Sequence, residues 1–312
     1  RYPFRLLNGC DARFLNLSLW IVDANGNPLS ELPFYVFANE SGLLAQVVKV
    51  TTGSFEKLPG NGRAGTPTPA RHPDAALLLG NAERVDVIVD FSGLAPGTVV
   101  RMFNTGPDSP FGGFPISPDD LADPGTTGQV MQFVVGTLLG PDRSKPPQQL
   151  KLPAIAPLVP TATRQVSLNE VESGLVCVEE QGGDLVPLPG VTAPECDPGS
   201  FPFGPTQALL GTLASDGSGV ALRWESALTE NPQLGSTETW EIYNFTMDAH
   251  PIHLHLVNFQ VVNREAFGGL PYPPEPWEWG FKDTVIAYPG EITRIRARFD
   301  IAGLYVWHCH IV

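Results

Sequence analysis

Five of the six histidines in this sequence lie in two short motifs, and these motifs carry the residue types and spacing best suited to metal chemistry. The first is His250-Pro251-Ile252-His253-Leu254-His255, and the second is His308-Cys309-His310. A single histidine is most often a structural or surface residue. Five histidines concentrated in two strand-like segments argue against that interpretation and indicate a metal centre.

The first motif has the spacing of ligands on a β-strand. Side chains alternate between the two faces of a strand, so His253 and His255 would project to the same side. His250 lies across Pro251, and we expect this proline to break the strand ladder and let the His250 imidazole aim elsewhere.

The second motif distributes its side chains in the same way. His308 and His310 would share one face of a strand while Cys309 points to the opposite face. One tripeptide could therefore serve two metal centres, one on each side of the strand. The backbone between Cys309 and its neighbours would give electrons a short covalent route between the centres.

The ligand types narrow the choice of metal. A thiolate with imidazoles suits copper or zinc, and two histidines with one cysteine and a weak axial group form a blue-copper site. Zinc alone would account for one cluster, but not for Cys309 between two histidines that face away from it. A hydrolase with Cys309 as nucleophile fits poorly, because the adjacent histidines on a strand point away from the thiol. Copper is the favoured metal.

In the segments that must position these motifs, hydrophobic residues recur at every second position. Three segments show this period of two: 84–91, 129–135 and 291–299. No long segment has a helical period, and the 32 glycines and 32 prolines read as turns between many short strands. The sequence therefore predicts an all-β protein built from sandwich or barrel domains.

A proline-rich stretch divides the chain. Residues 141–163 contain six prolines and little strand character: Pro141, Pro146, Pro147, Pro153, Pro157 and Pro160. Such a stretch favours an extended, fairly stiff connection. We expect one β domain over residues 1–140 and a second, metal-binding β domain over residues 164–312.

Charge, hydropathy and cysteine content limit the classes of partner. The formal charge of −14 argues against nucleic-acid binding, and no apolar run approaches the length that spans a bilayer. Cys177 and Cys196 flank a loop rich in Gly, Pro and acidic residues. A disulfide there would stabilise the fold by about 3 kcal/mol, but the sequence alone leaves the pairing open.

The two histidine motifs, taken in this order, resemble those of the multicopper oxidases: laccases, bilirubin oxidases and, above all, the bacterial spore-coat laccase type. The resemblance covers most of the chain. Residues 1–8 and 82–91 look like the family's second cupredoxin domain, and residues 164–178 and 240–245 look like its third. The resemblance implies tandem cupredoxin-like Greek-key β-sandwich domains.

The resemblance also implies a role for each motif residue. His250 and Cys309 would bind the type 1 copper, which accepts electrons from the donor. The type 2 copper would take His253, and the binuclear type 3 site would take His255, His308 and His310. Dioxygen would be reduced to water at the resulting trinuclear cluster, with Cys309, His250, His308 and His310 as the catalytic residues. Ile311 would pack as an apolar wall of the type 1 site.

The family pattern has parts that this sequence does not show. A second type 1 histidine and the axial ligand would lie beyond Val312, and the two H-x-H motifs of the family's first domain are absent. The remaining histidine, His72, is expected to be a surface residue. We therefore expect a missing first cupredoxin domain as partner, from the same precursor or from an associated fragment.

The resulting prediction is a laccase-like oxidase of phenols, aromatic amines or similar small donors, with dioxygen as acceptor and no membrane span. Two alternatives remain: a single-copper electron-transfer protein, and a coat or interaction protein with a vestigial copper site. Only three methionines are present, which disfavours a Met-rich cuprous-ion oxidase. Bilirubin and manganese(II) remain open as donors, and the loop 271–279 is a candidate border of the donor pocket. The resemblance and the possible disulfide favour an extracytoplasmic location: secreted, periplasmic or spore surface.

Overall fold

The structure is a computed structural model that describes residues 1–59, 67–171, 177–182, 184–188, 196–202 and 207–311. Within these described residues the regular elements are twenty-four strands and two short 3-10 helices. This confirms the all-β class expected from the period of two. None of the helices in the described part of the chain is long and apolar enough to cross a membrane.

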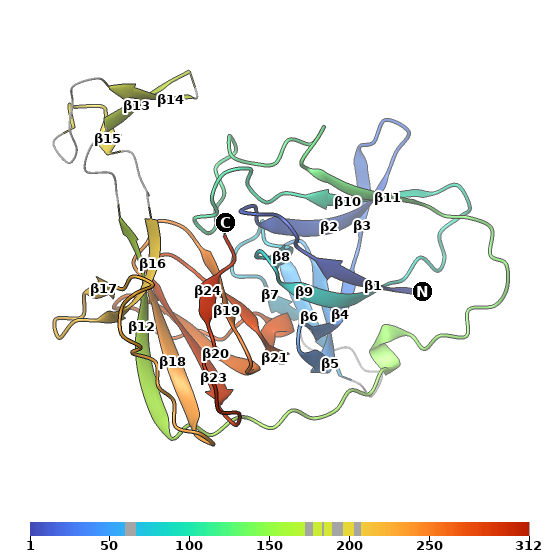
Figure 1. The fold of residues 1–312 in the computed structure, drawn as a ribbon. Coiled ribbons are helices and arrows are strands. Elements are labelled where there is room, and N and C mark those ends of the chain that lie inside the picture. Colours follow the sequence, from blue (N-terminus) through green and yellow to red (C-terminus); the bar gives the residue numbers. More distant parts are fainter. Residues whose placement is uncertain (60–66, 172–176, 183, 189–195, 203–206, 312) are drawn as a thin grey trace.

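The first half of the chain forms two sheets around one apolar core (Figure 1). The six-stranded sheet has the order β1 (Tyr2–Leu7), β9 (Arg84–Val89), β4 (Phe34–Asn39), β5 (Gly42–Thr51), β6 (Ser54–Leu58) and β7 (Pro67–Pro69). The other sheet has the order β11 (Gln129–Val134), β10 (Val99–Asn104), β2 (Leu15–Val22) and β3 (Pro28–Leu32), and β8 (Leu77–Leu79) pairs with β2. Neighbours such as β1 and β9 are far apart in sequence, as Greek-key connections require.

The second half repeats this two-sheet arrangement. Its seven-stranded sheet has the order β17 (Gly219–Ala221), β16 (Gln207–Leu213), β12 (Ala162–Val171), β18 (Thr237–Asn244), β23 (Glu291–Arg298), β20 (Phe259–Ala266) and β21 (Phe281–Lys282). The facing sheet has three strands, β22 (Thr284–Ala287), β19 (His250–Leu254) and β24 (Trp307–Cys309). Side chains from both sheets, among them Ile242, Ile252 and Ile295, form a second apolar core.

The three segments that showed the period of two all contain strands. Buried and partly exposed positions alternate along β9, because one face of this strand packs on the core. β11, in contrast, lies at the edge of its sheet and is exposed at nearly every position. Its alternating residues mark a strand but not a buried face.

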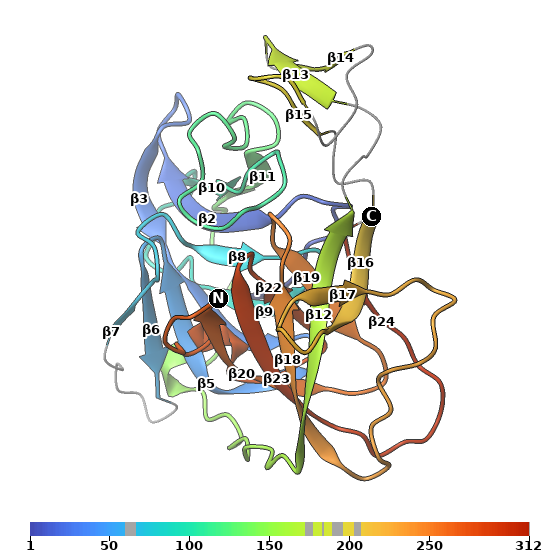
Figure 2. The ribbon, with the colours of Figure 1, turned by 90° about the vertical axis from the view of Figure 1, so that its left-hand side faces the viewer.

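A further small sheet stands away from the two larger bodies in both ribbon views (Figures 1 and 2). It contains β14 (Asp184–Leu188), β13 (Cys177–Gln181) and β15 (Phe201–Pro202). A disulfide joins Cys177 to Cys196 across a sequence separation of 19 residues. The structure thus makes the pairing that the sequence left open, although part of the intervening loop lies outside the described residues.

The proline-rich segment 141–163 runs between the two pairs of sheets and is tied to both halves. The N-terminal amine of Arg1 lies 3.0 Å from a carboxylate oxygen of Asp142, and Leu158 donates to the side chain of Gln260 at 2.8 Å. The segment contains the 3-10 helix η1 (Pro147–Gln149). Among the described strands, none pairs across this segment, which supports our proposal of two domains at 1–140 and 164–312.

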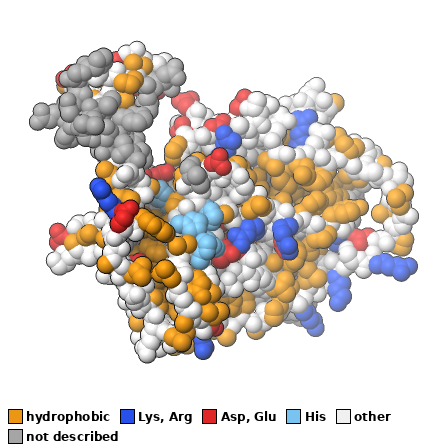
Figure 3. Space-filling view, viewed as in Figure 1, with side chains coloured by type: hydrophobic (Ala, Val, Ile, Leu, Met, Phe, Trp, Pro, Cys, Tyr) orange, Lys and Arg blue, Asp and Glu red, His pale blue; other side chains and the backbone are white. Residues whose placement is uncertain are grey.

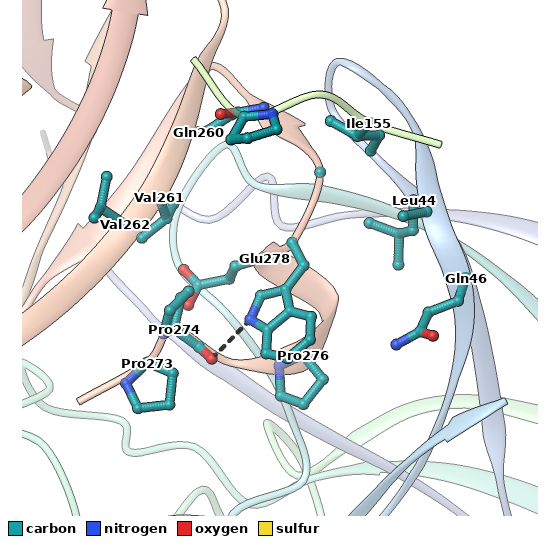
Figure 4. A pocket seen from close by; sticks show the side chains of 14 residues that line it. Leu44, Gln46, Ile155, Gln260, Val261, Val262, Pro273, Pro274, Pro276 and Glu278 are labelled. Carbon is teal, nitrogen blue, oxygen red and sulfur yellow. Dashed lines mark hydrogen bonds between the residues drawn. The ribbon is translucent and has the colours of Figure 1, made fainter. Parts of the chain in front are cut away.

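The two halves share apolar contacts. Trp277, on the 3-10 helix η2 (Pro276–Glu278), is buried in the core of the first half and meets Phe55 edge-to-face at 4.6 Å. Trp279 instead borders a cavity of about 430 Å³ between the halves (Figure 4). No residue of the two histidine motifs lines this cavity. The loop 271–279 therefore joins the halves, and this cavity does not connect it to the motifs.

Candidate metal centre

The three-stranded sheet brings the two histidine motifs together, because β19 lies between β22 and β24 and pairs with both. The register pairs His253 with His308 and Ile252 with Cys309. Residues directly opposite each other on paired strands project to the same face. His253 and His308 thus share one face of the sheet, and Cys309 lies on the other, which is the separation expected from the spacing.

On the first face, four imidazoles converge. The ligand atoms of His253, His308 and His310 all lie within 4.8 Å of one another. Nε2 of His255 lies 3.0 Å from Nε2 of His308, and the rings of His253 and His255 are 4.7 Å apart. In the space-filling view these histidines form a patch at the surface near the centre of the molecule (Figure 3).

On the opposite face, Cys309 meets His250. Its Sγ lies 3.4 Å from Nδ1 of His250, which is buried. The backbone N–H of Ile311 donates to the same sulfur at 3.3 Å. Cys309 packs against the apolar core of the second half, and the Ile311 side chain packs against a separate apolar cluster that contains Phe14 and Phe111.

The expectation that Pro251 breaks the strand ladder is wrong. β19 includes Pro251, which pairs with Ile286, and its carbonyl accepts a hydrogen bond from the N–H of His310 at 2.9 Å. The carbonyl and nitrogen of one strand residue point to the same neighbour, so the missing N–H lies on the β24 side, where the ladder ends at Cys309. His250 reaches the Cys309 face by ordinary alternation along the strand.

The second nitrogen of His250 is held by polar side chains. Nε2 lies 2.7 Å from Oγ1 of Thr246, 3.5 Å from Asp248 and 3.9 Å from Glu170. Burial raises the pKa of both carboxyls, and for Glu170 the charge of Asp248 adds to the effect. These contacts fix the imidazole with Nδ1 toward Cys309.

The Nδ1 nitrogen of His253 also has defined polar partners. Its Nδ1 lies 2.8 Å from the carbonyl oxygen of Asp283 and 3.3 Å from Oγ1 of Thr284. The Asp283 carboxylate is 3.5 Å from the same nitrogen. Burial acts to raise the pKa of Asp283, but hydrogen bonds from His253, Arg84 and Thr284 outweigh it and hold the pKa below its ordinary value.

The protonation states suit metal binding. Burial lowers the pKa of His250, and burial together with the neighbouring imidazoles lowers the pKa of His255 and His310, which favours the neutral form that binds metals. Burial raises the pKa of the Cys309 thiol to about 11, so this proton would leave as the metal binds. A thiolate and imidazole on one face and four imidazoles on the other fit copper in both places.

His72, the remaining histidine, stays apart from both motifs. Its ring stacks on Phe114 at 5.5 Å and 8°, and 24% of the side chain is exposed. It is therefore a partly covered surface residue that also lines a second cavity, of about 200 Å³. It does not appear among the described groups of metal-ligand geometry.

The residues around the ligands were not identified from the sequence. Asp248 and Thr246 lie close to the first motif, and this proximity is the one signal that could have found them. Glu170 and Asp283 carry no such signal, because only the fold brings them to the histidines.

Comparison with known proteins shows the family to which the chain belongs. Residues 207–312 match the model of the multicopper oxidase family. A laccase of Bacillus subtilis is 30% identical over 331 residues, which cover all of this chain and 48% of that protein. A laccase of Haloferax volcanii is 31% identical over 320 residues, covering all of this chain and 42% of that protein.

Among solved structures, the McoA multicopper oxidase of Aquifex aeolicus is similar with a TM-score of 0.59 and 22% identity, over 99% of this chain and 52% of that one. This likeness shows the tandem cupredoxin-like Greek-key sandwich fold. The chain spans about half the length of the proteins it matches. The chain belongs to the multicopper oxidase family, whose cofactor is copper.

Proposed function

We propose that this chain is the copper-binding part of an oxidase that takes single electrons from small donors and reduces dioxygen to water. One observation carries the proposal: β24 and the residue after it present Cys309 to His250 on one face, and present His308 and His310 to His253 and His255 on the other. A protein that only carries electrons needs the Cys309 face alone.

The proposed ligand roles follow the two faces. Cys309 and His250 hold the type 1 copper; His253 holds the type 2 copper; His255, His308 and His310 hold the type 3 pair. Bound copper would supply one-electron redox chemistry on the Cys309 face and dioxygen chemistry on the face with the four imidazoles, which we call the dioxygen face.

The chain's own residues prepare the Cys309 face for one-electron transfer. Thr246 holds the His250 ring so that Nδ1 points to the thiol, the second core packs against Cys309, and Ile311 is proposed to form an apolar wall of the site. The backbone from Cys309 to His308 and His310 joins the two faces through covalent bonds.

The remaining ligands are proposed to come from elsewhere. The family resemblance implies a second type 1 histidine, an axial ligand and four histidines from a first cupredoxin domain, supplied by the same precursor or an associated fragment. We also propose an extracytoplasmic location, which the Cys177–Cys196 disulfide supports because disulfides persist in oxidising compartments.

Copper content and oxygen uptake, measured on the complete protein, test the proposal. We expect about four copper ions per molecule, a blue type 1 signal, and dioxygen consumption driven by a phenolic donor. A single bound copper without oxygen uptake would favour the electron-transfer alternative. Protein that cannot be loaded with copper would favour a vestigial site in a coat or interaction protein.

A second class of donor is favoured by the carboxylates beside His250. Glu170 and Asp248 form, with His250, a group whose ligand atoms lie within 4.8 Å of one another. Two carboxylates next to the imidazole that serves the type 1 site would attract a cationic donor, such as manganese(II) or a protonated aromatic amine. Neutral phenols would gain nothing from them.

Replacing Glu170 by glutamine should therefore raise KM for a cationic donor about tenfold, the loss of one favourable charge contact of roughly 1.4 kcal/mol. KM for a neutral phenol should stay within about twofold. The control is Glu225→Gln, which removes an exposed carboxylate from another loop. Equal changes for both donors, or none for the cation, would rule out a role for this carboxylate in donor choice.

A further inference from the structure

The first half of the chain contributes no residue to the two histidine motifs, yet it holds the segment that contacts His253. Lys282 on β21 belongs to the second half, and its Nζ lies 2.8 Å from Glu40 and 3.1 Å from Glu83, both in the first half. All three side chains are buried. The chain is thereby fixed to the first half at the residue before Asp283.

Arg84 fixes Asp283 itself. Nη1 of Arg84, on β9, lies 3.0 Å from Oδ1 of Asp283, and Nη2 lies 2.5 Å from Oδ2. The pair is bidentate and only partly exposed, 29% for Arg84 and 19% for Asp283. The guanidinium also donates to the carbonyl of Ala82 at 2.6 Å, which orients it from the turn just before β9. Because the planar Arg84 guanidinium donates to Asp283 and to Ala82 at the same time, it restricts the orientation of the Asp283 carboxylate.

Asp283 in turn determines which nitrogen of His253 is available to a metal. Its backbone carbonyl lies 2.8 Å from Nδ1 of His253, and a carbonyl oxygen can only accept a hydrogen bond. Nδ1 must therefore carry the proton in the neutral ring, which leaves the lone pair on Nε2. The Asp283 carboxylate, 3.5 Å from Nδ1, favours the same tautomer.

We propose that Arg84 is a positioning residue for the metal site, acting through Asp283 to fix the tautomer and orientation of the His253 imidazole. The inference rests on the proposed function only in taking His253 as a copper ligand. Through Arg84, the first half of the chain would influence the dioxygen face although it supplies no ligand to that face. Partners that orient a ligating histidine typically change metal affinity about 10- to 100-fold when removed.

The competing explanation is that Arg84 and Asp283 merely join the two halves. Loss of the pair would then lower stability and leave the His253 tautomer unchanged. A matched pair in the first half separates these explanations. Arg5 makes the same bidentate contact with Asp86, at 2.8 and 2.9 Å, but on an exposed surface far in sequence from either motif.

The first test compares Arg84→Gln with Arg5→Gln in the metal-free full chain, using ¹⁵N NMR of the six histidine rings. In the unmodified protein and in Arg5→Gln we expect His253 as the Nδ1–H tautomer. Arg84→Gln should shift it toward a mixture of tautomers, and Arg84→Lys should restore it in part. An unchanged His253 signal in Arg84→Gln would overturn the proposal. Should that variant fail to fold, Asp283→Asn, which keeps the backbone carbonyl but removes the carboxylate that Arg84 holds, takes its place in the comparison.

The second test measures copper retention in the complete protein by electron paramagnetic resonance. Arg84→Gln should bind type 2 copper about 10- to 100-fold more weakly while the type 1 signal stays. Equal loss of all copper would indicate a general structural role instead. If even the unmodified protein binds no copper, the proposed function fails, but the tautomer of His253 still decides the role of Arg84.

Discussion

Replacing Cys309 by serine is expected to abolish the blue absorption of the protein and to reduce donor-driven oxygen uptake at least about a thousandfold. The absorption of a type 1 site comes from its thiolate–copper bond, and a hydroxyl oxygen does not replace a thiolate as a soft ligand. The Cys309 thiol lies 3.4 Å from His250, and the backbone on either side of Cys309 leads directly to His308 and His310, so this residue links the two faces. Visible absorption and an oxygen electrode measure the two effects.

The other free cysteine gives the matched control. Cys10 is partly buried and lies outside both motifs, so Cys10→Ser should leave absorption and oxygen uptake unchanged. Copper bound at the dioxygen face should survive in Cys309→Ser, because its histidines point away from the sulfur. A variant Cys309→Ser that remained blue and active would show that Cys309 is not the type 1 ligand.

Replacing Lys282 by methionine should lower the free energy of unfolding by about 3–5 kcal/mol near pH 8, because it leaves two buried carboxylates without their cation. In the intact protein, burial disfavours the charge on Lys282, but Glu40 and Glu83 outweigh it and raise its pKa. The two glutamates lie on the opposite side of the boundary between the halves from Lys282. Their mutual repulsion in the variant would weaken the contact that fixes Asp283.

The loss of unfolding free energy in Lys282→Met should grow as the pH rises. Burial raises the pKa of Glu40 to about 7 even with Lys282 present, and burial also raises the pKa of Glu83. A carboxyl whose pKa is higher in the folded than in the unfolded state takes up a proton on folding. Stability is therefore lost as the pH rises from about 4.5 through 7, and the loss should be steeper in Lys282→Met.

Urea denaturation at pH 5 and pH 8 measures this effect. Lys49→Met is the matched control, because Lys49 pairs with Glu56 at 3.3 Å in a more exposed position. Its removal should cost less than about 1 kcal/mol at either pH. A Lys282→Met protein with the stability of the control would contradict the buried-charge argument.

Some features of the site could be predicted from the sequence because they depend on local geometry. The alternation of side chains along a strand placed His308 and His310 together and Cys309 opposite, whatever the rest of the fold. The same argument failed at Pro251, because whether a proline interrupts a ladder depends on which neighbour its nitrogen faces. That neighbour is supplied by β24, which lies more than fifty residues later in the chain.

The sequence by itself determined the all-β class, the sidedness of both motifs and the choice of copper, since strand periodicity and ligand chemistry are properties of short segments. Only the tertiary structure decided that His250 meets Cys309, that Glu170 flanks it, and that Arg84 reaches His253 through Asp283. The physical reason is that these contacts join residues separated by tens to about two hundred positions. Such contacts depend on strand order and on packing between the halves, which no local pattern encodes.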